Sequence, residues 1–123
     1  MVNWRDNRIE SAAQGYNPTV IARMKSGFAV IGDTQFLPGY CVLLGYPKVG
    51  SLNDLPVGRR LDFLQDMTLV GDAIMSVCKP DRINYEILGN TDAFLHAHIF
   101  PRYHWEDESR RRSPVSGRPM GAS

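Results

Sequence analysis

The sequence predicts an α+β domain: an antiparallel sheet with one long helix and one short N-terminal helix packed on it. Four stretches are short apolar runs or alternate apolar and polar residues, as strands do. One longer stretch repeats apolar residues at alternating spacings of four and three, as an amphipathic helix does. A chain of 123 residues is long enough for one domain around one hydrophobic core.

The N-terminal part is expected to contribute the short helix. Residues 1–17 are mostly polar, with Trp4 as the one large apolar anchor. Asn17 followed by Pro18 is typical of a helix start, with Asn as N-cap and proline at the first helical position. We therefore expect a short helix over residues 19–25, ended by the following Ser-Gly pair.

Two strands and the long helix follow. Residues 28–31 and 40–46 are apolar runs separated by a loop with a Pro-Gly turn, which predicts an antiparallel hairpin. Residues 56–78 form the predicted long helix, which a lysine and a proline end. Its predicted inward stripe consists of Phe63, Met67, Val70, Ile74 and Val77, and is widened by Leu61, Leu64 and Leu69.

Two more strands complete the predicted sheet. Residues 82–88 alternate between apolar and polar side chains, and a Gly-Asn-Thr-Asp turn leads into residues 94–103. Successive side chains of a strand point to opposite faces. The face expected to meet the core carries Leu95, Ala97 and Ile99, and the other face carries Phe94, His96, His98 and Phe100.

The composition changes after Tyr103. An acidic stretch, the Arg110–Arg112 run and a segment rich in Ser, Pro, Gly and Arg follow one another. We expect a folded domain over residues 1–103 and an extended or disordered tail over 104–123. Trp105 and the arginine run could serve a polyphosphate, although such charge runs are usually solvated.

Charge and hydropathy exclude several classes of protein. A net charge of +1 gives no general attraction to nucleic acid or membrane surfaces. No apolar run approaches the ~20 residues of a membrane span, and the N-terminus has no apolar secretory core. We therefore expect a cytoplasmic protein that binds neither nucleic acid nor membranes. Cys41 and Cys78 lie in apolar patterns and are expected to be buried hydrophobic residues.

Two of the three histidines, His96 and His98, share one face of a predicted strand. Three interpretations are open. Neutral imidazoles two residues apart can share a metal ion. One imidazole can attack a substrate while its neighbour stabilises the charge. Alternatively, the two are half-buried histidines that hydrogen-bond to the backbone.

The segment His-Ala-His-Ile-Phe-Pro-Arg at residues 96–102 resembles the end of the histidine triad (HIT) motif, His-φ-His-φ-His-φ-φ, in which φ is apolar. His98 matches the third histidine and His96 the middle one, whereas Phe94 occupies the place of the first. Pro38-Gly39 and the strand after it are similar to the family's Pro-Gly-His segment. The predicted order of elements is also that of the family.

The resemblance implies a nucleotide hydrolase or transferase, with a diadenosine polyphosphate as the best single substrate. His96 would attack the α-phosphorus, and water would release a nucleoside monophosphate from the nucleotidyl-histidine. His98 would donate to a phosphate or leaving-group oxygen. The carbonyl of Phe94 would hold the far nitrogen of His96. The family implies no cofactor, and its members typically form homodimers.

Other residues of the expected site come from loops and strand ends. Asn90 and Thr91 lie in the turn before the histidine strand, where the amide of Asn90 could reach the phosphate, although Gly-Asn is also a common turn pair. Asp33 could accept the ribose hydroxyls or cap a turn. A phosphate contact from Arg102 is a further possibility. Candidates for the wall of a base pocket are Phe28, Ile31 and Leu43.

Two other functions remain open. The first is a binding module that keeps the nucleotide pocket without turnover, which the missing first histidine favours. The second is a metal-dependent enzyme that uses His96, His98 and His104, although no carboxylate stands at ligand spacing on the same strand.

Overall fold

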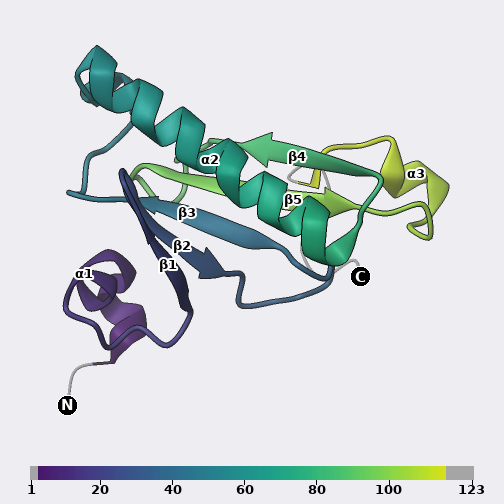
Figure 1. The fold of residues 1–123 in the computed structure, drawn as a ribbon, viewed down its shortest axis with the longest axis horizontal. Coiled ribbons are helices and arrows are strands. Elements are labelled where there is room, and N and C mark those ends of the chain that lie inside the picture. The colour runs from purple at the N-terminus through teal and green to yellow at the C-terminus, as the bar shows by residue number, and fades with distance from the viewer. Residues whose placement is uncertain (1–2, 116–123) are drawn as a thin grey trace.

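A five-stranded antiparallel sheet with the order β1-β2-β3-β5-β4 lies at the centre of the structure, a computed structural model that describes residues 3–115 (Figure 1). The strands are β1 (Val20–Met24), β2 (Gly27–Ile31), β3 (Cys41–Gly45), β4 (Arg82–Glu86) and β5 (His96–Arg102). The α-helices are α1 (Arg8–Ala13), α2 (Val57–Cys78) and α3 (Glu108–Arg111), and the short 3-10 helices are η1 (Trp4–Asn7) and η2 (Leu52–Asp54). The α+β class with its long helix is as predicted.

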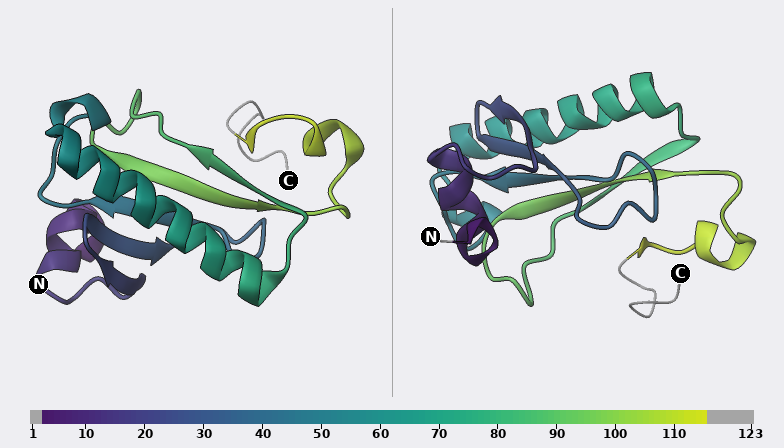
Figure 2. Two further views of the ribbon diagram at one scale, coloured as in Figure 1. Left: turned by 45° about the horizontal axis from the view of Figure 1, so that its top comes forward. Right: turned by 90° about the horizontal axis from the view of Figure 1, so that it is seen from below.

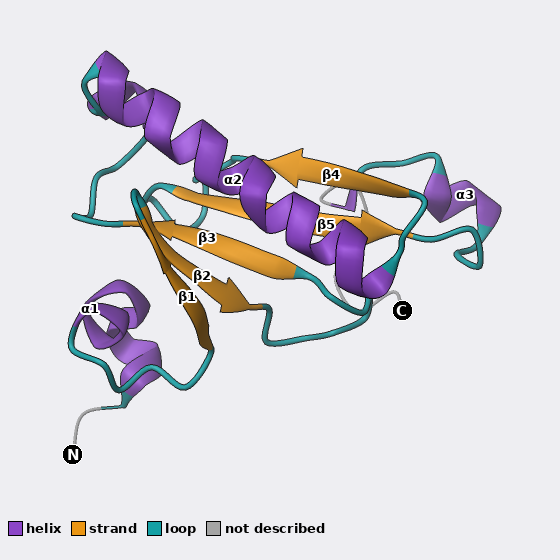
Figure 3. Ribbon diagram, viewed as in Figure 1, coloured by secondary structure: helices purple, strands orange, loops and turns teal. Residues whose placement is uncertain are grey.

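Helix α2 covers one face of the sheet (Figure 3). Leu95, Ala97 and Ile99 are buried in the core beneath it, as the alternation predicted. Four residues of the predicted stripe face the core, whereas Val77 is 80% exposed. Cys78 packs inward in its place, because four residues beyond Ile74 match the helical repeat better than three at this point. The three leucines expected to widen the stripe are also exposed, which corrects that prediction.

Two segments cover parts of the opposite face of the sheet. Helix α1 packs Ile9 and Ala12 on Phe28, Val30 and Leu44. At the other end lies the segment that carries α3, so that α2 is on one side of the sheet and α1 and α3 are on the other (Figure 2). The histidine-bearing strand β5 is an inner strand between β3 and β4.

The short helix expected over residues 19–25 is wrong. Val20–Met24 is the edge strand β1, which pairs with β2. Asn17 closes a local turn instead of a helix, since its Oδ1 accepts hydrogen bonds from the backbone N–H and hydroxyl of Thr19. The β-branched Val20 and Ile21 then favour extended backbone.

The N-terminal helix occurs earlier, as α1, and its N-cap is Asn7. The Asn7 side chain accepts a hydrogen bond from the backbone N–H of Glu10. An N-cap residue followed three positions later by glutamate is a helix-start signal that residues 1–17 carry.

Residues 104–115 differ from the extended tail expected there. They form a turn and helix α3, and Trp105 stacks on Tyr103 with ring centroids 5.0 Å apart. The remainder of the predicted tail, residues 116–123, lies outside the described residues. No helix within residues 3–115 combines the length and apolar character of a membrane span.

Candidate functional site

His96 and His98 lie side by side on the face of the sheet opposite α2. The register pairs Leu44 with His96 and Val42 with His98 across β3, and Glu86 with His98 across β4. The two imidazole centroids are 4.9 Å apart and the rings are nearly perpendicular. Strand alternation therefore brings both histidines into one site on an inner strand.

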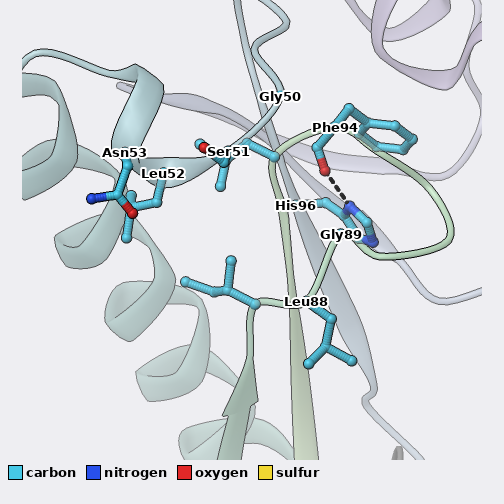
Figure 4. Close-up of a pocket in the computed structure, with 10 residues that line it drawn as sticks. Gly50, Ser51, Leu52, Asn53, Leu88, Gly89, Phe94 and His96 are labelled. Carbon is cyan, nitrogen blue, oxygen red and sulfur yellow. Dashed lines mark hydrogen bonds between the residues drawn. The ribbon is translucent and has the colours of Figure 1, made fainter.

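The imidazole of His96 has a defined orientation. Its Nδ1 lies 2.8 Å from the carbonyl oxygen of Phe94, and the residue is only 7% exposed (Figure 4). A carbonyl can only accept a hydrogen bond, so Nδ1 carries the proton. In the neutral ring, Nε2 is then left with a lone pair, which is the form that a nucleophile needs.

His98 is held by a different partner, the hydroxyl of Tyr40, which lies 2.7 Å from its Nδ1. Burial, followed by the neighbouring His96, lowers the pKa of His98 below its ordinary value of 6.5. Burial also raises the pKa of Tyr40 to about 12. Near neutral pH, both groups are therefore uncharged.

A pocket of about 260 Å³ opens beside His96. Figure 4 shows that its walls come from the loop before α2, the end of the segment after β4 and the approach to β5. The lining residues are Gly50, Ser51, Leu52, Asn53, Ile87, Leu88, Gly89, Phe94, Leu95 and His96. The pocket is a space available for a ligand that His96 helps to line.

The expected loop residues differ in where they lie relative to this pocket. Phe94 and Gly89 line the pocket with His96, whereas Asn90 and Thr91 are exposed in the β4–β5 loop outside its lining. The Phe94 ring packs against His96 with centroids 4.7 Å apart. Lys48 places its ammonium group 5.6 Å from the centroid of the same ring and so adds a positive charge near the pocket.

Asp33, the expected ribose contact, forms a bidentate ion pair with Arg8. Nη1 and Nη2 of Arg8 lie 2.9 and 2.6 Å from the two carboxylate oxygens. The hydrogen bond from Arg8 lowers the pKa of Asp33. A ribose could therefore reach this carboxylate only by sharing it with, or displacing, the guanidinium group of Arg8.

The expected base pocket does not assemble from its three predicted residues. The β2–β3 register puts Phe28 on the histidine face and Ile31 on the α2 face. Phe28 is buried under α1, and Leu43 is buried in the core beneath α2. One pocket cannot have Phe28 and Ile31 as walls, because they point to opposite sides of the sheet.

Arg102 is buried, and its guanidinium group is held by other protein groups, which contradicts the expected phosphate contact. Its Nε and Nη2 bond Glu106, and the salt bridge is 3.1 Å long with both side chains at least 95% buried. Its Nη1 bonds the side chain of Asn84 and the carbonyl oxygen of Ser113, and its Nη2 also bonds the carbonyl oxygen of Arg110. Arg102 therefore holds the C-terminal segment on the sheet.

Sequence reasoning missed Tyr40, Glu86 and Ser51 as neighbours of the histidines. Tyr40 directly precedes an apolar strand and was available as a polar group at its end, yet only the strand register brings it to His98. Glu86 is one of the polar residues in the alternating stretch 82–88, but its position opposite His98 again depends on register. Ser51 comes from a loop with no motif of its own.

Across residues 3–115, no group of three or more His, Cys, Asp or Glu side chains is placed to hold a metal ion. His104, the third histidine of the metal-dependent alternative, is exposed and lies 3.5 Å from Asp81.

Comparisons with known proteins place the fold. The sequence matches no family model and no curated protein. The structure is similar to a Hit-like protein involved in cell-cycle regulation from Bartonella henselae, with a TM-score of 0.71 and 15% identity over 87% of this chain and 86% of that one. It is similar to a histidine triad protein from Bradyrhizobium japonicum, with a TM-score of 0.68 and 21% identity over 82% and 75%.

A histidine triad protein from Sinorhizobium meliloti is similar over 97% of this chain and 81% of that one, with a TM-score of 0.71 and 16% identity. At these identities, the likeness concerns the fold. The chain has the fold of histidine triad proteins.

Proposed function

We propose that this protein is a nucleotide hydrolase or transferase that acts through a covalent nucleotidyl-histidine intermediate on His96. The hydrogen bond from His96 Nδ1 to the Phe94 carbonyl carries the proposal, because it leaves Nε2 with a free lone pair on a residue that lines a pocket. The histidine triad fold of the similar structures gives this chemistry a precedent at the level of fold.

The proposed reaction has two displacements. Nε2 of His96 attacks the α-phosphorus, and the bond from phosphorus to the leaving oxygen breaks. A leaving polyphosphate departs as an anion and needs no proton. The ring becomes a cation, which the Phe94 carbonyl stabilises through the same Nδ1–H hydrogen bond. Water then attacks phosphorus, the P–N bond breaks with its electron pair returning to Nε2, and a proton leaves with solvent.

A diadenosine polyphosphate is the substrate that we propose first. The ammonium group of Lys48 lies near Phe94 at the pocket and could attract the phosphate chain. Asp33 could contact the ribose only if Arg8 shares its carboxylate, so substrate binding would have to rearrange the Arg8–Asp33 ion pair.

Nucleotide binding without turnover is the second candidate. One feature favours it: on the alignment that the resemblance implies, Phe94 stands in place of the first motif histidine. Under this alternative, nucleotide would stabilise the protein and no product would form.

Product analysis on diadenosine tetraphosphate and adenosine phosphoramidate tests the proposal. We expect adenylate release by the unchanged protein, loss of release in His96→Ala, and full release in His104→Ala, which changes an exposed histidine outside the site. Binding without release from either substrate would support the second candidate. Release that a chelator abolishes would instead support the metal-dependent alternative.

We also propose that the protein forms a homodimer through the outer face of α2. Several apolar side chains project from this helix into solvent, among them Val57 at 65% and Leu61 at 63% exposed, followed by Leu64 and Met75. Such side chains on one helix are typical of an interaction surface.

A further inference from the structure

The hydrogen bond between Tyr40 and His98 runs in the direction that the tautomer of His98 sets, because a phenol can both donate and accept. A phenol is the stronger donor of the two, and a neutral imidazole has one bare nitrogen that accepts. The lowered pKa of His98 and the raised pKa of Tyr40 keep both groups neutral around pH 7. The 2.7 Å contact therefore joins a neutral phenol to a neutral imidazole, and the phenol is the better donor of the two.

We propose that Tyr40 is a positioning residue that fixes His98 as the tautomer protonated at Nε2. His98 then presents an N–H donor suited to a phosphoryl oxygen, while His96 presents a lone pair. The two neighbouring imidazoles thus hold opposite tautomers, one set by a backbone carbonyl and the other by a tyrosine. This inference rests on the proposed function for its catalytic consequence, although the tautomer itself does not.

The ring of Tyr40 is tightly confined. It stacks on Phe100 with centroids 4.5 Å apart and planes 11° apart, and Phe36 lies 5.9 Å away. On a third side it lies against Gly32, where an added Cβ would come within 2.2 Å of the ring. Only a residue without a side chain allows this approach, so the ring cannot swing away from His98 without moving the backbone.

The loop that carries Tyr40 is also clamped. Gln35 donates to the carbonyl oxygens of Gly32 and Tyr40 and accepts from the backbone N–H of Gly39. The hydroxyl of Tyr103 donates to the carbonyl oxygen of Pro38. Because Tyr103 follows the histidine strand directly, the strand and the turn before Tyr40 are fixed relative to each other.

Three other charged or titratable groups influence His98 electrostatically. His96 precedes it on β5, and Glu86 faces it from β4. Both act on its pKa electrostatically, as does the more remote Asp92. Tyr40 differs from them in making a direct hydrogen bond to the ring nitrogen that sets the tautomer.

The test uses the full chain labelled with ¹⁵N-histidine and long-range ¹H–¹⁵N spectra, without any nucleotide. We expect Nδ1 of His98 to be unprotonated and Nε2 protonated in the unchanged protein. In Tyr40→Phe, which keeps the aromatic stacking, we expect a mixture of tautomers. Tyr85→Phe is the matched control, because Tyr85 lies on the α2 face of β4, and it should leave the spectrum of His98 unchanged.

Kinetics supply the second readout. We expect kcat of Tyr40→Phe to fall by about tenfold, the scale of one hydrogen bond. His98→Gln keeps an N–H donor but has no tautomer, so Tyr40→Phe should cause no further loss in that background.

Protonation of His98 at Nδ1 in the unchanged protein would overturn the inference, and so would an unaltered tautomer in Tyr40→Phe. The wild-type spectrum is decisive even if the variant does not fold. Absence of hydrolysis would count against the proposed function alone, since the tautomer is measured without substrate.

Discussion

The backbone carbonyl of Phe94 accepts a hydrogen bond from Nδ1 of His96 at 2.8 Å. The contact that directs the free nitrogen of His96 therefore comes from the main chain at position 94 and not from its side chain. On the alignment that the resemblance to the histidine triad motif implies, position 94 is that of the first histidine, and a phenylalanine there keeps the carbonyl that orients His96.

Restoring that histidine should change little. We predict that kcat/KM of Phe94→His stays within about tenfold of the unchanged protein, because the carbonyl is retained and only an outer contact of the ring changes. Steady-state kinetics on diadenosine tetraphosphate measure this. A gain or loss of a hundredfold or more would show that the side chain itself takes part in the chemistry.

The lowered pKa of His98 predicts a pH-dependent stability. The folded state binds the proton on His98 less readily than the unfolded chain, whose ordinary value is 6.5. Well above pH 6.5, His98 is neutral in both the folded and the unfolded state, and its titration takes nothing from the free energy of unfolding. As the pH falls below 6.5 toward the lower folded pKa, the unfolded state takes up the proton first, and stability is lost.

The matching measurement is urea unfolding between pH 7 and pH 5, a window above the ordinary carboxyl range. We expect the free energy of unfolding of the unchanged protein to fall more across this window than that of His98→Gln, which cannot titrate. Parallel curves for the two proteins would contradict the prediction.

Two Arg–Glu pairs in the C-terminal segment give a matched test of burial. Arg102–Glu106 is buried, whereas Arg112–Glu108 is exposed, and both partners are four residues apart. We predict that Glu106→Gln lowers the free energy of unfolding by about 3–5 kcal/mol, because it leaves the guanidinium of Arg102 buried without its counter-charge. Glu108→Gln should cost less than about 1 kcal/mol. Equal effects in urea unfolding would disprove the structural role assigned to Arg102.

The proposed homodimer is tested by sedimentation velocity. We predict that Leu61→Glu, which places a charge on the exposed face of α2, shifts the protein from dimer to monomer with its circular dichroism spectrum unchanged. The control is Ile21→Glu, a similarly exposed site on the edge strand β1, which should remain dimeric. A monomer in the unchanged protein would refute the proposal.

The elements with strong periodicity could be predicted from the sequence. The apolar stripe of α2 and the alternation of β5 predict which side chains face the core. For β5 these are Leu95, Ala97 and Ile99, which lie in the core of the structure. Residues 19–25 were misassigned because an Asn-Pro pair is compatible with both a helix start and a turn. The hydrogen bonds from Thr19 to Asn17 select the turn.

The surroundings of the histidines depend on contacts that the sequence does not encode locally. Tyr40 and His98 are far apart in the chain and meet through the β3–β5 register. The burial of Arg102 could not be predicted from the sequence. Its partner Glu106 lies in a polar segment with the composition of a disordered tail. Spacing on one strand predicted the His96–His98 pair, whereas pairing between strands decides its neighbours.

The central claim is that His96 Nε2 becomes covalently bonded to phosphorus. Rapid acid-free quenching of the protein with diadenosine tetraphosphate, followed by intact-mass and peptide mass spectrometry, tests it most directly. We expect an adenylyl adduct on the peptide that contains His96, absent in His96→Ala and present in His104→Ala. Turnover without any adduct on His96, or an adduct that persists in His96→Ala, would contradict it.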